Sequence, residues 1–371
     1  MARWHLPPKM AVPIPWGRTI VASDLRHDAN AFTVLRWVLA SSVMFSHAFD
    51  ISAQGPVDPT IAILHVPISR LAVLLFFGLS GFLVAGSLVK RGVVDFAVAR
   101  ALRLMPGLWV MLIVTALIVG LIFDAQGLTG LFHTASLRRY IGYNALLLGR
   151  YYTLDGAFAG NRLPELVNGS LWTIPQEVRC YIALAIVGGL GLLVSRRALT
   201  VGYILIIVAD LLVPQDVVPV IAATRPLGAT FFFGVLLYLW RDHVFLSWPL
   251  AAVAVIAARL LPVGPLGEIA TALAWVYMAL VSAILVPRRA KAASAAMPDY
   301  SYGIYIYGFP AQQAAAALGL GVTYYANALV GFLIVIPLAA LSWHLIEKPA
   351  LALKPRLTRA TAIPAQGDST A

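Results

Sequence analysis

Two ionisable side chains, Arg36 and His47, lie within one apolar stretch of the chain, residues 33–49. In a helix, eleven residues bring the second side chain back to within about 20° of the first, about 16 Å further along the axis. The pair would therefore line one wall of a helix at two depths. Ionisable groups inside a membrane-spanning helix are costly to bury and are candidates for function. A structural alternative has equal weight: Arg36 reaches a lipid headgroup, and His47 is a satisfied polar residue of the core.

A second pair of cations, Arg100 and Arg103, follows the second apolar stretch. The two residues are one helical turn apart, so both guanidinium groups can face one anion. Basic residues at the end of a membrane segment are also ordinary topological anchors. Taken alone, these two residues favour the anchor over an anion-binding site.

The carboxylate of Glu177 lies near the start of another apolar stretch, residues 172–194. A carboxylate inside a membrane needs a partner. If the first segment runs outward and this one runs inward, His47 and Glu177 share the outer half of the bilayer. Arg36, Arg100 and Arg103 then share the cytoplasmic half. A large anionic donor that enters from the cytosol would require this distribution of charge.

The composition of the chain is that of a membrane protein. Of its 371 residues, 60% are hydrophobic and only 12% are charged, and the mean hydropathy is +0.85, far outside the range of soluble domains. The net charge of +11 comes from short basic clusters between apolar segments, a pattern that orients a membrane protein and argues against a nucleic-acid surface. The single Cys180 excludes a disulfide framework, and the sequence shows no cluster of metal ligands.

Apolar runs long enough to cross a bilayer predict an all-α protein, a polytopic bundle of about ten transmembrane helices. Lysine and arginine in the connections number 18 on one side and 4 on the other. The positive-inside rule places the more basic side, and both termini with it, in the cytoplasm. The predicted spans are residues 31–49, 69–89, 104–123, 172–194, 199–214, 225–240, 248–262, 267–286, 300–317 and 324–345.

This topology divides the chain into three parts. Residues 1–30 are a basic cytoplasmic tail, residues 31–349 form the transmembrane domain, and residues 350–371 form a cytoplasmic tail expected to be disordered. The domain contains one long outer segment, residues 124–170, and connections of this length are usually functional or carry structure of their own. Within it, residues 137–150 have helical spacing and would either lie flat on the outer surface or cover the bundle.

Five motifs follow one another along the chain. They are the spacing of Arg36 and His47; Phe77-Gly-Leu-Ser-Gly-Phe-Leu83 followed by Arg100-Ala-Leu-Arg103-Leu-Met-Pro106; Leu171-Trp-Thr-Ile-Pro-Gln-Glu177 with Tyr181; Tyr300-Ser-Tyr-Gly-Ile-Tyr-Ile-Tyr307 with Pro310; and Leu345-Ile-Glu-Lys-Pro349. In this order they resemble the acyltransferase-3 family, over about residues 31–349. Its members are integral membrane proteins that move acyl groups, commonly acetyl from acetyl-CoA, onto sugars of envelope polysaccharides and related glycans.

The resemblance implies roles for five residues. Arg36 and His47 match the arginine and histidine pair of the family, and Arg100 and Arg103 match its second arginine motif. Glu177 matches the acidic residue of the fourth-span motif. On this basis His47, Glu177 and Arg36 are the predicted catalytic residues. Arg100 and Arg103 are the residues predicted to bind the donor.

We therefore expect a multi-pass enzyme of the cell inner membrane that transfers acetyl from acetyl-CoA to a hydroxyl of an exported saccharide or a lipid-linked glycan. His47 would act as general base towards that hydroxyl, or would carry the acyl group itself. Glu177 would orient His47 or stabilise its cationic form. The expected partners are the acceptor glycan and the lipid bilayer, with no metal and no nucleic acid. The competing class is a secondary transporter or a lipid-linked glycan flippase, in which buried charges are also expected.

Overall fold

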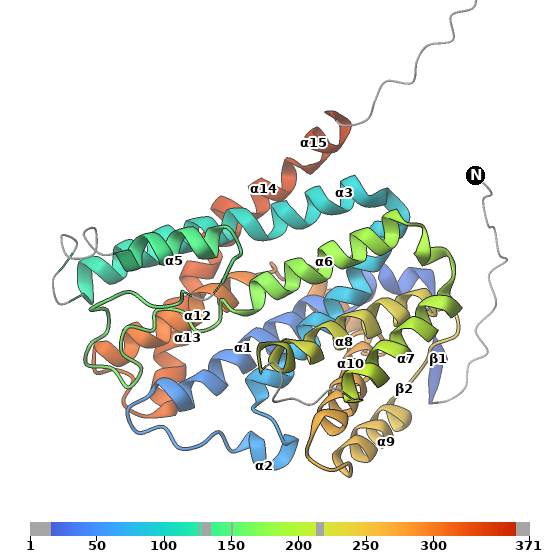
Figure 1. The fold of residues 1–371 in the computed structure, drawn as a ribbon, viewed down its shortest axis with the longest axis horizontal. Coiled ribbons are helices and arrows are strands. Elements are labelled where there is room, and N and C mark those ends of the chain that lie inside the picture. The colour runs from blue at the N-terminus through green and yellow to red at the C-terminus, as the bar shows by residue number, and fades with distance from the viewer. Residues whose placement is uncertain (1–15, 125–126, 128–134, 150, 213–218, 361–371) are drawn as a thin grey trace, which may run out of the picture.

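The computed structural model describes residues 16–124, 127, 135–149, 151–212 and 219–360. Most of these residues are helical, and Figure 1 shows the long helices running in roughly one direction, as an elongated bundle. Residues 1–15 of the predicted N-terminal tail and residues 361–371 of the C-terminal tail lie outside the described residues. So do residues 125–126, 128–134 and 150 of the predicted outer segment.

Within the described residues, each of the ten predicted apolar segments lies mostly on helical structure, and residues 213–214 of the segment 199–214 lie outside them. One-turn 3₁₀ helices occupy Ala22–Leu25, His27–Ala29 and Leu192–Val194, and a π-helical turn occupies Trp343–Glu347. The α-helices are α1 (Phe32–Ile51), α2 (Thr60–Leu64), α3 (Ile68–Ile122), α5 (Ala135–Ala145), α6 (Thr173–Gly189), α7 (Arg196–Leu212), α8 (Pro219–Leu239), α9 (Trp248–Arg259), α10 (Pro265–Ile284), α11 (Arg288–Ala296), α12 (Ser301–Ala317), α13 (Tyr324–Ser342), α14 (Lys348–Ala352) and α15 (Lys354–Ala360).

The second and third predicted spans lie on one element, α3, which bends at Gly92. The backbone of Gly92 has φ 82° and ψ 175°, a conformation outside the helical region that glycine adopts without steric cost. Each half of α3 exceeds the roughly 20 residues needed to cross a bilayer. Four helical segments of the described chain are long and apolar enough to span a membrane: Phe32–Ile51, Ile68–Ile122, Pro265–Ile284 and Tyr324–Thr358. The count of ten spans and the cytoplasmic position of the termini stay predictions.

The structure adds one small sheet to the predicted all-helical fold. Strands β1 (Gly17–Thr19) and β2 (Phe245–Ser247) pair in antiparallel fashion, with Gly17 opposite Ser247. The Arg18 guanidinium also binds the Asp24 carboxylate at 2.6 Å. The β1–β2 pairing attaches the segment before α1 to the residues that precede α9, and the ion pair lies within that first segment. At the other end of the chain, Lys354 of α15 binds Asp95 of α3 at 2.8 Å, so helical structure continues to residue 360.

Helices α3 and α8 approach each other closely through glycines. A Cβ atom on Gly81 would lie 1.9 Å from the carbonyl oxygen of Phe231, and one on Gly234 would lie 1.9 Å from the carbonyl oxygen of Gly78. No Cβ atom fits at these distances. Close packing through small residues is typical of helix contacts in membranes, where the lipid itself is apolar.

The predicted outer segment covers the bundle and also enters it. Helix α5 packs on the second half of α3, and the Trp109 indole donates to the carbonyl of Ala145 at 3.2 Å. Residues 151–172 form an irregular stretch whose end is buried, with Asn168 fully shielded and Ser170 2% exposed. The Asn168 amide donates to the carbonyl of Ile306, one turn and a half into α12, at 2.8 Å. Helix α6 therefore begins inside the bundle.

Replacing Gly234 by Ala should destabilise the protein, because the added methyl group meets backbone atoms of α3. Overpacking of a tight contact costs about 1–3 kcal/mol. Gly228→Ala is a matched control on the same helix, since a Cβ atom there meets nothing within 4 Å. Thermal unfolding of the purified protein in detergent should show a lower midpoint for Gly234→Ala only. Equal midpoints for the two variants would contradict this packing of α3 on α8.

Candidate active site

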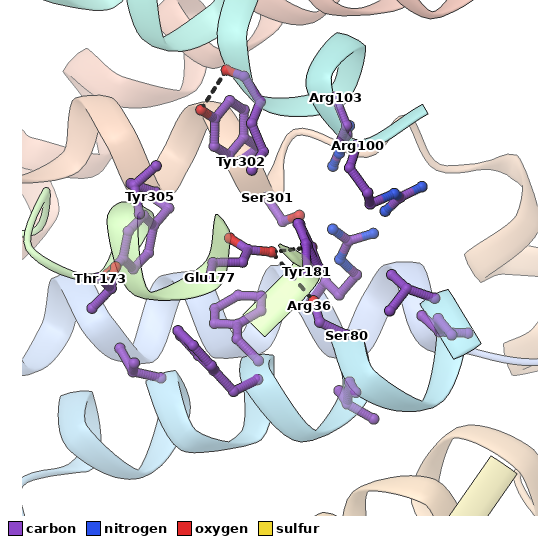
Figure 2. A pocket seen from close by; sticks show the side chains of 18 of the residues that line it. Arg36, Ser80, Arg100, Arg103, Thr173, Glu177, Tyr181, Ser301, Tyr302 and Tyr305 are labelled. Carbon is purple, nitrogen blue, oxygen red and sulfur yellow. Dashed lines mark hydrogen bonds between the residues drawn. The ribbon is translucent and has the colours of Figure 1, made fainter. Parts of the chain in front are cut away.

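A cavity with many polar side chains lies between α1, both halves of α3, α6 and α12 (Figure 2). Its volume is about 90 Å³, room for an acetyl-sized group and a few water molecules. The polar lining residues are Arg36, Ser80, Arg100, Arg103, Thr173, Glu177, Tyr181, Ser301, Tyr302 and Tyr305. Four of the five predicted site residues are among them; His47 is not.

One carboxylate, Asp299, binds two of the arginines. It lies in the short loop before α12, where its Oδ2 atom accepts from Nη1 of Arg36 at 2.9 Å and from Nη2 of Arg103 at 2.7 Å. The hydroxyl of Ser301 donates to Oδ1 at 2.5 Å. Burial by itself raises the pKa of Asp299, but Arg103 and Arg36 outweigh it and hold that pKa below its usual range. Asp299 therefore stays ionised and holds α1, α3 and α12 together.

Arg103 is enclosed by partners on all sides. Its Nη1 atom contacts the carboxylate of Glu347 at 3.4 Å, and the hydroxyl of Ser342 donates to the other oxygen of Glu347 at 2.8 Å. The guanidinium also lies 5.8 Å from the ring centre of Tyr302 and 5.7 Å from that of Trp343. Glu347 is only 1% exposed and lies on the π-helical turn, a departure from α-helix that often occurs at functional sites. Two carboxylates thus neutralise Arg103.

Arg100 has a different environment, although it is one turn away from Arg103. Its guanidinium lies 5.9 Å from the ring centre of Tyr181. Within the described residues it forms no ion pair, and its buried Nε atom has no hydrogen-bond partner. Figure 2 shows its guanidinium at the edge of the cavity, beside that of Arg36. Arg100 therefore keeps donors available for an anion, whereas Arg103 does not.

Glu177 belongs to a small hydrogen-bonded group in the same cavity. The hydroxyl of Tyr181, one turn further along α6, donates to its Oε1 atom, and the hydroxyl of Ser80 on α3 approaches the same oxygen at 3.4 Å (Figure 2). Nearby, Thr173 and Tyr305 share a hydrogen bond of 2.6 Å between their hydroxyl oxygens. These contacts fix α6 against α3 and α12 around the cavity.

The sequence predicted that Glu177 lies close to His47, but the structure places the two residues in different regions. His47 is partly exposed and its ring contacts that of Phe309 on α12, with centres 5.2 Å apart. It lies about three turns beyond Arg36 on α1, so about 16 Å separates them along the helix axis. Glu177 shares the cavity of Arg36 instead. The reason is the buried stretch 151–172, which starts α6 inside the bundle and so carries Glu177 away from the end of α1.

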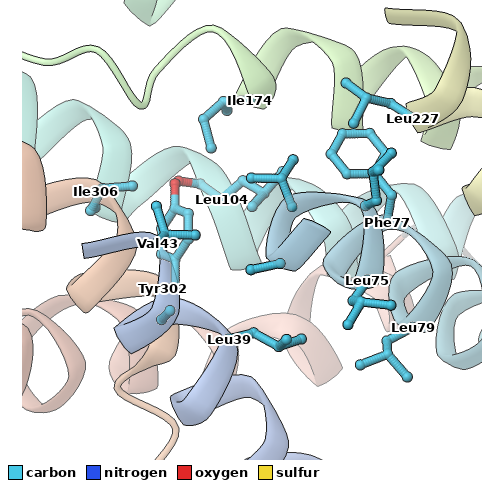
Figure 3. Close-up of a cluster of buried hydrophobic side chains, with 14 of the residues drawn as sticks. Leu39, Val43, Leu75, Phe77, Leu79, Leu104, Ile174, Leu227, Tyr302 and Ile306 are labelled. Carbon is cyan, nitrogen blue, oxygen red and sulfur yellow. The ribbon is translucent and has the colours of Figure 1, made fainter. Parts of the chain in front are cut away.

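An apolar core connects the two regions. Leu39 and Val43, on α1 between Arg36 and His47, belong to one buried cluster with Leu104 of α3 and Ile306 of α12 (Figure 3). The Tyr302 hydroxyl donates to the carbonyl of Leu104 at 2.8 Å within this cluster. Close packing holds α1 in a fixed position along its length. The cavity and His47 are therefore at a constant separation.

The far end of α1 is held by the outer segment. The guanidinium of Arg162 donates to the carbonyls of Phe49, Ser52 and Gly55 at 3.2, 3.2 and 2.9 Å. Phe49 lies in the last turn of α1, whose carbonyls have no partner within the helix. Arg162 therefore caps α1 just beyond His47. The outer segment thus supports both ends of the site, since its last residues also position α6.

Sequence reasoning missed the two carboxylates that bind the arginines. Asp299 directly precedes the Tyr300–Tyr307 motif, and Glu347 lies inside the Leu345–Pro349 motif, but neither received a role. A carboxylate beside a membrane segment needs a cation as partner, and this requirement is the sequence signal that could have identified both residues. The hydrogen bond from Tyr181 to Glu177 was also not predicted, although Tyr181 belongs to one of the five motifs.

Asp299→Asn should destabilise the protein, because it keeps the size of the side chain but removes the charge that two arginines share. Breaking a buried ion pair costs about 3–5 kcal/mol, and the cost here should fall below that range because the Asp299 side chain is 19% exposed. Asp28→Asn is the matched control, since Asp28 pairs with Arg26 on the surface and both side chains are mostly exposed. Chemical or thermal unfolding in detergent should separate the two variants clearly.

The effect of Asp299 should also have a defined pH range. Because the pKa of Asp299 is lowered in the folded protein, its contribution is complete above the usual aspartate pKa of about 3.9 and is lost as the pH falls towards the lowered value. The stability difference between wild type and Asp299→Asn should therefore be constant between about pH 5 and pH 8. A difference that disappears within this range would show that Asp299 is not held as an anion.

Comparison with known proteins identifies the family of the chain. Residues 30–347 match a family model described as an acyltransferase domain, Acyl_transf_3. An O-acetyl transferase of Shigella phage Sf6 is 27% identical over 342 residues, which cover 87% of this chain and 96% of the phage protein. Nodulation protein 10 of Rhizobium leguminosarum bv. viciae is 28% identical over 364 residues, with coverages of 88% and 95%. No solved structure matches the chain. The chain belongs to the acyltransferase-3 family and is an acyltransferase.

Proposed function

We propose that this acyltransferase moves acetyl from acetyl-CoA to a hydroxyl of an envelope or exported saccharide, at the cell inner membrane. The observation that carries the proposal is the guanidinium of Arg100, which borders the cavity and forms no ion pair within the described residues. A guanidinium in such a position is a binding group for phosphate. The phage relative is named an O-acetyl transferase, and this name supports acetyl as the group transferred.

The layout of the site suits a long donor. Acetyl-CoA carries its phosphates at one end and its thioester at the other, joined by an extended arm. Arg100 and Arg36 lie at the cavity, whereas His47 lies about 16 Å further along α1 from Arg36. A donor with its phosphates at Arg100 would present the thioester towards His47 if its arm followed α1 outside the packed core of Leu39 and Val43. The cavity itself is too small for the whole cofactor, so most of the donor would lie outside it.

The chemistry then requires one base and one path for the proton. The imidazole of His47 would take the proton of the acceptor hydroxyl while its oxygen attacks the thioester carbonyl. The carbon–sulfur bond breaks, and the departing thiolate takes the proton from the imidazolium, so that free CoA and the acetyl ester result. In the alternative, an imidazole nitrogen of His47 would attack the thioester carbonyl, and the departing thiolate would take the imidazole proton to give free CoA. The acceptor oxygen would then displace the imidazole from the acetyl carbon, and the hydroxyl proton would return to His47.

Arg36 and Glu177 have supporting roles in this proposal. Arg36 adds positive charge beside Arg100, while its bond to Asp299 keeps it at the cavity wall. Glu177 holds the hydroxyl of Tyr181, whose ring lies against Arg100. Through Tyr181, Glu177 would orient Arg100 towards the donor and act as a positioning residue.

Release of free CoA distinguishes this function from the competing one. The purified protein in detergent, given acetyl-CoA and an acceptor glycan, should liberate CoA thiol only when both are present. A secondary transporter or flippase would liberate none. The expected product is an acetylated glycan whose mass is raised by one acetyl group per transfer.

Arg100→Ala should raise the KM for acetyl-CoA about ten- to hundredfold, because a hydrogen bond to a charged group contributes about 1.5–3 kcal/mol. The KM for the acceptor and the unfolding midpoint should change little. Arg91→Ala is the matched control, because Arg91 is an exposed cation on the same helix. If donor affinity were unchanged in Arg100→Ala, Arg100 would be an ordinary topological anchor.

His47→Ala should lower turnover about 10²- to 10⁴-fold, the usual effect of losing a general base. The affinity for acetyl-CoA should be retained, since His47 is remote from the arginines. His27→Ala, which removes an exposed histidine ahead of α1, should have normal activity. Normal turnover of His47→Ala at matched expression would remove His47 from the mechanism.

A further inference from the structure

A second and larger hollow lies between α6, α7 and α8, away from the site. Its volume is about 650 Å³, within the usual range of ligand pockets. Helix α7 forms its outer wall, and none of the residues of α7 is buried. The lining is mostly apolar and includes Leu184, Val187, Leu192, Leu193, Leu199, Ile206, Ile207, Phe232, Val235 and Leu236. We call this hollow the α7–α8 groove.

Two facing glycines widen the groove. Gly202 of α7 and Gly228 of α8 both line it, and a Cβ atom added to either would meet nothing within 4 Å. The hydroxyl of Tyr203, also in the lining, is buried and has no hydrogen-bond partner within the described residues. The space therefore contains an unused polar group beside room for an elongated apolar ligand.

The two ends of the groove differ in charge. At one end Asp210 and Arg225 form an ion pair of 2.7 Å, so charge is balanced there. At the other end the lining residue Ser195 is followed by Arg196 and Arg197. The guanidinium of Arg196 lies 4.3 Å from the ring centre of Trp240, at the end of α8. This end of the groove is basic, whereas the space between the ends is apolar.

We propose that the α7–α8 groove binds one anionic phospholipid of the bilayer. A hydrocarbon chain fills the space between the two glycines, and the phosphate lies at the basic end near Arg196 and Arg197. The groove is separate from the catalytic cavity, because the rings of Tyr181, Phe231 and Phe232 stand between them, with neighbouring centres 5.9 and 5.4 Å apart. Helix α1, which carries His47, contributes no residue to the groove either, and this favours a lipid of the bilayer over the lipid-linked acceptor, which must reach His47.

The first test fills the groove. Gly202→Leu combined with Gly228→Leu places two side chains in the open space, and leucine is a good helix former, so both helices are retained. Gly142→Leu is the matched control, because its Cβ atom also meets nothing within 4 Å, on α5. The readouts are the phospholipid retained per protein by native mass spectrometry and the shift of the unfolding midpoint with added phosphatidylglycerol or phosphatidylcholine.

Wild type and Gly142→Leu should retain one phospholipid and be stabilised more by phosphatidylglycerol than by phosphatidylcholine. The double leucine variant should bind phosphatidylglycerol at least about tenfold more weakly, a loss of about 1.4 kcal/mol. Unchanged retention in the double variant would overturn the proposal. Displacement of phosphatidylglycerol by an equal concentration of a polyprenyl phosphate would also overturn it, since the groove would then hold a lipid-linked carrier.

The second test removes the charge but leaves the groove open. Arg196→Gln combined with Arg197→Gln should abolish the preference for phosphatidylglycerol over phosphatidylcholine while a lipid is still retained. Arg138→Gln removes an exposed cation of α5, a helix that contributes no residue to the groove, and should keep the preference. A preference that survives in the double glutamine variant would show that these arginines do not bind the phosphate. Neither test depends on acetyl transfer, so each stands if the proposed function fails.

Discussion

One shared carboxylate organises the candidate site. Asp299 binds Arg36 of α1 and Arg103 of α3 and lies at the start of α12, so three elements far apart in sequence meet at one anion. Buried charges are tolerated only when they are paired. This requirement decides which faces of these helices turn inward. Most of the remaining polar residues of the cavity lie on the helices that Asp299 holds together, and the others lie on α6.

The ion pairs also distinguish Arg100 from Arg103, although the two arginines look equivalent in the sequence. Arg103 is neutralised by Asp299 and Glu347 and enclosed by two aromatic rings, so it holds the bundle together. Arg100, one turn earlier, is directed to the edge of the cavity by the ring of Tyr181 and keeps its charge uncompensated. In a medium of low polarity, such a cation is attractive for phosphate.

The outer segment affects the site from outside the helices. Arg162 caps the end of α1 beyond His47, while Asn168 and Ser170 enter the bundle and bind α12 through the Ile306 carbonyl and the Tyr305 hydroxyl. Irregular backbone at this depth is stable only where protein encloses it and satisfies its polar groups. This buried stretch sets the point at which α6 starts, and with it the depth of Glu177.

The sequence by itself determined the helices, the cations and the family. Long apolar runs exclude any fold but a helical one, and the order of five motifs pointed to an acyltransferase. The spacing of three residues alone predicted that Arg100 and Arg103 lie on one face of a helix. Such features depend on neighbours within a few residues, which is why they can be read without a structure.

Only the tertiary structure decided which charges meet. Asp299 is 263 positions from Arg36 and 196 from Arg103, and no local pattern joins them. The expected contact of Glu177 with His47 rested on the assumption that every apolar segment starts at the membrane surface. The stretch before α6 enters the bundle instead, because its polar groups find partners on α12. The depth at which a helix starts within a bundle is set by packing between distant segments, so it cannot be predicted from the length of an apolar run.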